Sequence, residues 1–303
     1  MHPSGANVTD TLECLMMCSR WRHSFGRRAI DIVVAALIFA HAPDVRAADY
    51  PGAIADLRVA RGAGKIAEAW LADATTQYRH FVLGSPYEAA SLMVRVRDGK
   101  LLRLTLPEGS VFEDRQPRLA DLDGDGIDEI VLVRSYLRRG AALAVIALQS
   151  GALSIVAETP PTGSPNTWLN PAGIADFDGD GQHDIAYVQM PHVLGLLRVW
   201  TLRSGRLVEI ASMPDTSNHV IGSPHLGLSA VADFDGDGVA DLAIPTRDRT
   251  YLRFLSFKGG ARELGRKPLE STAVYDFTLR HVSGVPFVDV GPAGGGSELI
   301  GLR

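Results

Sequence analysis

The chain is poor in cysteine and has no apolar run long enough to cross a bilayer as a helix. Its two cysteines, Cys14 and Cys18, both lie near the start of the 303 residues. If these first residues form a leader that is removed, the mature chain has no disulfide, no thiol nucleophile and no zinc–cysteine site. Bound metal would then be the available substitute for a covalent cross-link.

Other absences narrow the class of function. The sequence has no Gly-x-Ser-x-Gly elbow, no His-Glu-x-x-His pair and no phosphate-cradling glycine loop. With 30 Lys and Arg against 35 Asp and Glu, the net charge is −5, and no basic block or stripe indicates nucleic-acid binding. Helical periodicity is not sustained after residue 50. Alternating apolar and polar residues, as at 92–97 and 197–202, predict an all-β fold.

The N-terminal segment has the features of a secretion signal. Four arginines between residues 20 and 28 precede the apolar run at 32–40, and small or apolar residues within 45–47 permit cleavage before Ala48. We therefore predict a signal peptide with a long N-terminal extension over residues 1–47, a folded domain at 48–303, and a periplasmic or secreted protein. An uncleaved membrane anchor is the alternative.

One acidic motif, D-x-D-G-D-G-x-x-[DE], occurs three times. The copies begin at Asp121, Asp176 and Asp233, at intervals of 55 and 57 residues. Carboxylates at positions 1, 3 and 5 of a tight loop can converge, and a carbonyl at position 7 and an acid at position 9 can close the shell. Such an all-oxygen donor set suits calcium better than magnesium or zinc. The alternative is three Asp-Gly turns that bind nothing.

A second periodic signal coincides with the first. Two-residue hairpin turns are predicted at Asp98-Gly99, Ser150-Gly151, Ser204-Gly205 and Gly259-Gly260. One unit then reads strand, acidic loop, strand, connection, strand, tight turn, strand. Radial repetition of such four-stranded antiparallel blades makes a β-propeller, with calcium loops in the three central blades.

The number of blades depends on two weaker matches. Asp73 and Asp289 stand one period outside the three loops and predict degenerate terminal copies, as is usual for repeats. These anchors favour five blades, with six or more as the alternative. Residues 54–61 are predicted to complete the last blade and close the ring.

The loops and their period resemble the FG-GAP/VCBS repeats of bacterial secreted proteins and of integrin α-subunit propellers. The clear match covers residues 112–260, although the FG-GAP sequence itself is absent. The resemblance implies a propeller with about three calcium ions, each held between the first two strands of a blade. The implied ligands, with backbone carbonyls at Ile127, Gln182 and Val239, are Asp121, Asp123, Asp125, Ile127 and Glu129; Asp176, Asp178, Asp180, Gln182 and Asp184; and Asp233, Asp235, Asp237, Val239 and Asp241. Glu129 departs from the usual Asp, and Asp128 beside it competes for the same place.

The segments on the side opposite the acidic loops are long and carry aromatic, amide and basic residues. We predict that this side binds a glycan or protein ligand, through residues drawn from Arg115, Tyr136, Arg138, Asn166, Trp168, Asn170, His192, Asn218, His219 and His225. The chain is thus predicted to be a monomeric binding module that spans no membrane after signal cleavage. A calcium-dependent hydrolase or polysaccharide lyase and a structural adhesion module are the alternatives. Catalysis is the less favoured interpretation, because few pairs of acids lie outside the loops, Glu113-Asp114 being the main one.

Overall fold

The computed structural model describes residues 49–303, and these residues form twenty β-strands and no α-helix. Within this range no helix has the length and apolar character needed to cross a membrane. The strands pair into one nine-stranded sheet, two four-stranded sheets and one three-stranded sheet. The all-β class predicted from the sequence is confirmed. The predicted leader and both cysteines lie outside the described residues.

The nine-stranded sheet consists of two four-stranded groups. Group 1 contains β1 (Ala60–Arg61), β2 (Ile66–Thr75), β3 (Glu88–Val96) and β4 (Leu101–Thr105), and group 2 contains β6 (Arg118–Ala120), β7 (Glu129–Tyr136), β8 (Gly140–Gln149) and β9 (Ala152–Glu158). The short strand β5 (Ser110–Phe112) pairs with β3 through one residue and with β7 through three, so it joins the groups.

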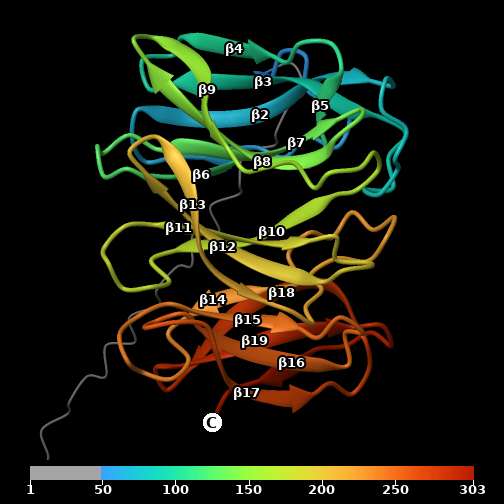
Figure 1. The fold of residues 1–303 in the computed structure, drawn as a ribbon, viewed down its shortest axis with the longest axis vertical. Helices are drawn as coiled ribbons and strands as arrows, with labels where there is room; N and C mark the ends of the chain where they lie inside the picture. Colours follow the sequence, from blue (N-terminus) through green and yellow to red (C-terminus); the bar gives the residue numbers. More distant parts are fainter. Residues whose placement is uncertain (1–48) are drawn as a thin grey trace, which may run out of the picture. The chain divides into compact units, whose positions relative to one another are not determined.

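The remaining sheets follow in chain order, and all their pairings are antiparallel. Group 3 contains β10 (Leu169–Ala175), β11 (Asp184–Gln189), β12 (Leu196–Arg203) and β13 (Arg206–Met213); group 4 contains β14 (Ala230–Ala232), β15 (Asp241–Pro245), β16 (Tyr251–Ser256) and β17 (Arg262–Pro268); and group 5 contains β18 (Ala273–Val282), β19 (Val285–Pro292) and β20 (Glu298–Ile300). In Figure 1 the early groups lie at the top and group 3 lies in the middle, whereas strands of groups 4 and 5 overlap in the lower part of the view.

Groups 2, 3 and 4 each follow the predicted order of elements. An acidic loop joins the first strand to the second in each group. A two-residue turn joins the third strand to the fourth in groups 2 and 3, whereas residues 257–261 join β16 to β17 in group 4. At Ser150-Gly151 and Ser204-Gly205 both residues have positive φ, between 50° and 80°. Two-residue hairpins need this geometry because its twist matches that of the flanking strands.

Alternation along the strands of group 2 buries both of its faces. On β7, Ile130 and Leu132 pack into the core shared with group 1, whereas Val131 and Val133 pack into the core shared with group 3. Successive side chains of a strand point to opposite faces, so an unbroken apolar run fits only a strand covered on both sides. Group 2 is therefore held between two neighbours.

The same rule orders the next layers. On β11, Ile185 faces group 2 and Ala186 faces group 4. On β15, Leu242 faces group 3, whereas Ala243 faces group 5. The hydrophobic core is thus divided into clusters that lie between consecutive strand groups. Groups 2, 3 and 4 each contribute side chains to two of these clusters.

The two degenerate loop copies were wrongly predicted. Asp73 lies inside β2, with its carboxylate paired with Arg103, and Asp289 lies inside β19, where it accepts hydrogen bonds from Ser297 and Arg280. Asp73 is followed by no glycine at the spacing of the acidic loops, and Asp289 has Gly294 at position 6 but Pro292 at position 4. At both places the chain continues as a strand.

The predicted partner of residues 54–61 was also wrong. Ala60 and Arg61 pair with β2 of group 1, not with group 5. The segment before them covers the outer face of group 1, where Tyr50 packs edge-on against the buried Trp70, with ring centroids 5.0 Å apart. Group 5 has three strands, and its strand β18 is largely exposed.

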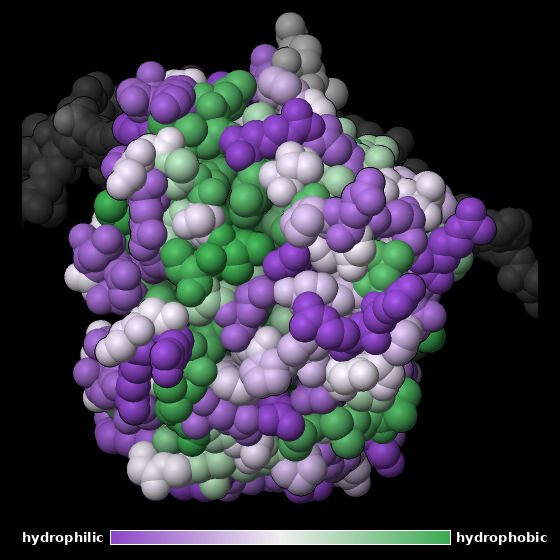
Figure 2. Space-filling model, turned by 45° about the horizontal axis from the view of Figure 1, so that its top comes forward, coloured by the Kyte–Doolittle hydropathy of each residue, from purple (hydrophilic) through white to green (hydrophobic). Residues whose placement is uncertain are grey.

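Some apolar side chains remain on the surface. On the face seen in Figure 2, hydrophobic residues gather in a hollow with hydrophilic residues along its margins. Among the large apolar side chains of residues 49–303, Val193 and Ile221 are the most exposed, at 67% and 69%. Both lie in connecting segments, not on strands.

We expect Gly173→Ala to destabilise the protein. A Cβ atom at Gly173 of β10 would lie 2.5 Å from Val231 of β14, so the change forces groups 3 and 4 apart. The expected loss is about 1–3 kcal/mol in the free energy of unfolding, measured by urea denaturation. Gly294→Ala is the matched control, because nothing lies within 4 Å of a Cβ there and its φ is not positive. Equal midpoints for the two variants would contradict this packing.

Candidate functional site

The three acidic loops share one internal hydrogen-bond pattern. In the first, Asp121 Oδ1 accepts from the N–H of Gly124 (2.8 Å) and Oδ2 accepts from that of Gly126 (3.0 Å). Asp176 and Asp233 do the same in the other loops. The glycines at positions 4 and 6 have φ between 78° and 91°, a conformation that residues with a Cβ rarely adopt. The turn is therefore shaped by the loop's own residues.

The acid at position 9 joins the loop to the core. Asp184 and Asp241, which open β11 and β15, are fully buried, and Oδ2 of each accepts the N–H of the position-2 residue at 3.0 Å. Those position-2 residues, Phe177 and Phe234, are themselves buried in the core. The other oxygen, Oδ1, is buried in both residues with no hydrogen-bond partner within the described part of the chain.

The structure brings together three of the predicted ligand positions in each loop. Oxygen atoms of positions 1, 3 and 9 lie within 4.8 Å of one another, in the sets Asp121, Asp123 and Glu129; Asp176, Asp178 and Asp184; and Asp233, Asp235 and Asp241. Position 5 instead accepts the N–H of position 7, for example from Gln182 to Asp180 at 2.9 Å. In the first loop Glu129 joins the set, whereas Asp128 faces Gly62 of group 1.

A pocket lies among the connecting segments at the other end of the strands. This histidine pocket, of about 160 Å³, is lined by His80, Asn166, Thr167, Trp168, Met190, Pro191, His192, Val193 and Ile221. The Trp168 ring is buried, stacks on His192 at 6.3 Å between centroids, and donates its N–H to Glu113 O at 2.9 Å. Trp168 is thus a wall of the pocket and not an exposed platform.

The residues predicted for ligand binding are divided among several places. Asn166, Trp168 and His192 line the histidine pocket, Tyr136 and Arg138 border a separate hollow, and His225 pairs with Asp276. Arg115, Asn170, Asn218 and His219 are buried. Asn170 and Asn218 donate to each other's backbone carbonyls at 3.1 Å, and Arg115 pairs with Asp56 and Leu83 O. Sequence reasoning missed His80 and the role of Glu113.

Comparison with known families identifies the repeat. Residues 121–187, which include the first two acidic loops, match the FG-GAP-like repeat family model. The resemblance predicted from the loop motif is confirmed over this segment. No curated protein matches the chain.

The solved structures that match the chain include longer proteins. They include the exotype rhamnogalacturonan lyase YesX (15% identity over 80% of this chain and 54% of that one, TM-score 0.44) and rhamnogalacturonan lyase YesW (13%, 80% and 56%, TM-score 0.45). The Bacillus licheniformis rhamnogalacturonan lyase PL11 gives 13% identity, 82% and 59% coverage and a TM-score of 0.42. The chain spans little more than half the length of these lyases, and likeness at this level says nothing of its activity.

The carboxyl groups at position 9 of the three acidic loops have raised pKa values. Burial, together with the neighbouring aspartates of each loop, raises the pKa of Glu129 to about 7 and that of Asp184 and Asp241 to about 6. A buried carboxylate near other carboxylates favours its neutral form unless a positive charge compensates it. A cation bound beside the position-9 acid would offset both the cost of burying its charge and its repulsion by the neighbouring aspartates.

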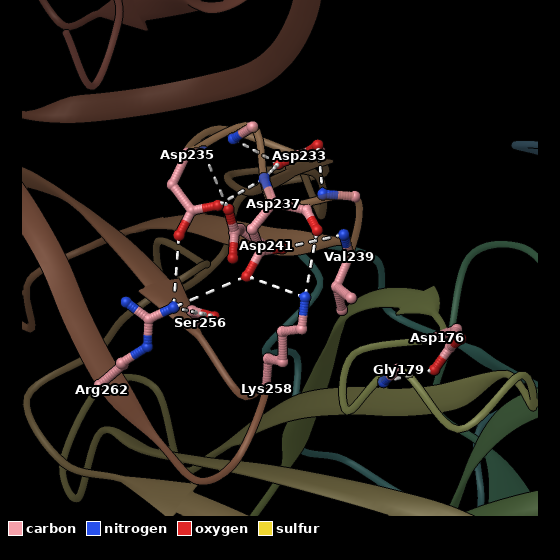
Figure 3. Close-up of polar contacts among 12 residues, drawn as sticks. Asp176, Gly179, Asp233, Asp235, Asp237, Val239, Asp241, Ser256, Lys258 and Arg262 are labelled. Atoms are coloured by element: carbon pink, nitrogen blue, oxygen red, sulfur yellow. Dashed lines mark hydrogen bonds and ion pairs between the residues drawn. The ribbon is translucent and has the colours of Figure 1, made fainter.

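Basic side chains approach two of the three loops. In the second, Arg203 lies 3.1 Å from Asp180; in the third, Arg262 lies 3.3 Å from Asp235 and Lys258 lies 3.4 Å from Asp237. Figure 3 shows Arg262 and Lys258 pointing toward the acids of the third loop. Within residues 49–303 no such ion pair involves the acids of the first loop, which therefore keeps the largest negative charge.

The histidines next to the pocket predict a pH dependence of stability. Burial lowers the pKa of His192 to about 4 and that of His219 to about 3. Below pH 6.5 the unfolded chain binds more protons at these rings than the folded protein, so their contribution to stability is lost as the pH falls from about 6.5 toward 4. Each ring contributes up to about 1.4 kcal/mol per pH unit.

His192→Asn should accordingly flatten this decline. The measurement is urea unfolding between pH 7 and pH 4.5 in calcium-containing buffer, and the exposed His281→Asn is the control. Identical pH profiles for the two variants would show that His192 is charged in the folded protein.

Proposed function

We propose that this FG-GAP-like repeat protein is a calcium-stabilised β-propeller that binds a glycan or protein ligand through the side opposite its acidic loops. The observation that carries the calcium part is that carboxylate oxygens of positions 1, 3 and 9 lie within 4.8 Å of one another in each loop. Carboxylates this close repel one another, and a hard cation with oxygen ligands is the partner that suits them. Positions 1, 3 and 9 of each loop would hold the ion, which neutralises the acids and fixes the loop.

The ring arrangement is supported by one cavity. First-strand residues, or residues just before them, from all five groups line a single cavity of about 500 Å³, including Arg58, Leu119, Gly173, Ser229 and Asp276. Arg58, before β1, donates to Pro224 O, before β14, at 2.8 Å, so group 1 reaches the link between groups 3 and 4. First strands around a common axis are the arrangement of a propeller. We propose five blades, the last of them with three strands.

The binding side is inferred from polar atoms of the histidine pocket that have no hydrogen-bond partner in the described part of the chain. The cavity of about 500 Å³ has three charged side chains: Arg118 pairs with Asp114 at 2.8 Å, Asp276 pairs with His225 at 2.9 Å, and Arg58 donates to a backbone carbonyl. The histidine pocket has exposed apolar side chains at its edge and imidazole nitrogens that lack partners among residues 49–303. Small-molecule sites have this combination of apolar walls and few convergent polar groups. The predicted leader makes the periplasm or the medium the proposed place of action.

A calcium-dependent hydrolase or lyase is the second candidate. The observation in its favour is His80, whose ring lines the pocket and whose Nδ1 lies 2.7 Å from the buried Glu113 carboxylate. A histidine oriented by an acid is a common general base. Assays on polysaccharides and phosphate esters, with and without EDTA, test this candidate. A glycan array and a pull-down from secreted fractions test ligand binding, and silence in both would reject the main proposal.

We expect about three calcium ions per chain. Because the folded protein alone binds them, calcium at 100 times its Kd should add about 2.7 kcal/mol of stability per site. EDTA should therefore lower the melting temperature, and metal analysis of the purified protein should give the stoichiometry. Fewer than two ions, or a melting curve insensitive to EDTA, would mean that the loops are plain turns.

Neutralising a basic neighbour should strengthen one site. Arg262→Gln removes a cation 3.3 Å from Asp235, so calcium affinity at the third loop should rise by about two- to fivefold, the range of an exposed ion pair. Isothermal titration calorimetry measures it, and Lys267→Gln on the same strand is the control because no ion pair of Lys267 is present in the described chain. Equal changes in both variants would point to a general charge effect.

A further inference from the structure

The tautomers of His192, which lines the histidine pocket, and of the buried His219 beside it follow from a chain of hydrogen bonds. His219 Nε2 lies 2.9 Å from Ser223 O, which can only accept, so Nε2 carries the proton. Nδ1 of the neutral His219 is then an acceptor, and His192 Nε2, 2.9 Å away, donates to it. Burial lowers the pKa of both rings, so they are neutral near pH 7. His192 Nδ1 is left as an acceptor without a partner among residues 49–303.

His80 also has a ring nitrogen without a hydrogen-bond partner in the described chain. Its Nδ1 faces Glu113 Oε1 at 2.7 Å, and the other carboxylate oxygen accepts from Ser135. Glu113 is 1% exposed, and its own carbonyl holds Trp168. A carboxylate fixes a proton on the nitrogen that faces it, so His80 Nδ1 donates to Glu113 and Nε2 is left without a partner in the described chain. Glu113 thus holds two lining residues of the pocket in place: His80 through its carboxylate and Trp168 through its backbone carbonyl.

The pocket combines the unpartnered nitrogens His80 Nε2 and His192 Nδ1 with apolar surface. Met190, Pro191, Val193 and Ile221 complete its lining, and Phe81 beside His80 is 47% exposed. A volume of about 160 Å³ corresponds to roughly five water molecules. This space accommodates one ring, not an extended chain.

Backbone conformation also marks this place. Phe81, Asn166 and Met190 have φ of 56°, 55° and 49°, and are three of the nine non-glycine residues with positive φ in the described chain. Two of them line the pocket, and the third adjoins His80. Residues are held in this region only where surrounding contacts compensate, and such positions gather at binding sites.

We infer that the histidine pocket binds a single sugar ring, whose hydroxyl groups hydrogen-bond to His80 Nε2 and donate to His192 Nδ1 while its C–H face lies against the apolar lining. The inference deepens the proposed function and rests on the binding side assigned there. The His192 acceptor requires a ligand that carries a donor, which a hydroxyl group provides and a carboxylate does not. The apolar lining requires that the rest of the ligand be weakly polar. A sugar ring at the end of a glycan meets both conditions and the volume.

Histidine NMR of the full chain tests the contacts. The ¹⁵N-labelled protein is titrated with a panel of methyl glycosides, and long-range ¹⁵N–¹H spectra report each ring nitrogen. At least one glycoside should shift Nε2 of His80 and Nδ1 of His192 and leave His281 unchanged. If no glycoside moves these two nitrogens, or if p-cresol binds the pocket as tightly as the best glycoside, the inference is wrong.

A rim variant tests the pocket without disturbing the fold. Ile221 is 69% exposed, so Ile221→Asp should leave the melting temperature unchanged and weaken glycoside binding by about tenfold. The control is Val208→Asp, on β13 and 42% exposed, which should bind as the parent does. Equal affinities for the two variants would overturn the assignment.

The inference and the proposed function can fail separately. Asp178→Ala should lower the melting temperature and leave glycoside affinity unchanged, since Asp178 belongs to an acidic loop. If a glycan array detects binding while His80 and His192 signals stay fixed, the proposed function stands and this pocket is not the site. If neither assay detects binding, the inference is rejected, and the proposed function is rejected as well if the pull-down captures no protein ligand.

Discussion

The two apolar faces of each central strand group are the constraint on which the fold depends. Because strands such as β7 carry apolar residues at successive positions, neither face of group 2 tolerates water, and a neighbouring group must cover each. Groups 3 and 4 obey the same requirement. This packing brings the first strands around one cavity and places each acidic loop at the same end of its group.

The loops and the core are joined through one carboxylate per loop. In the second and third loops, the position-9 aspartate uses one oxygen to hold the N–H of a buried phenylalanine and leaves the other free. Burial makes this group an anchor and also raises its pKa. The stability of each loop therefore depends on the positive charge that compensates its position-9 carboxylate. Arg203, Lys258 and Arg262 provide part of the compensation, unequally among the loops.

The candidate binding residues illustrate what motif reasoning can find. Amide and aromatic residues in long connections were predicted to face a ligand, and Asn166, Trp168 and His192 do meet at one pocket. Asn170 and Asn218 instead satisfy each other's backbone, because a buried connection must pair its own polar groups. His80 and Glu113 were missed since 33 residues separate them and no local pattern marks the pair.

The sequence by itself determined the strands, the turns, the acidic loops and their period, because each depends on neighbours within a few residues: alternation, paired glycines and closely spaced acids. Only the tertiary structure decided which group receives residues 60–61, that Asp73 and Asp289 lie in strands, which loops carry basic neighbours, and where the histidines meet. These features depend on contacts between residues far apart in the chain, and local spacing carries no record of such contacts.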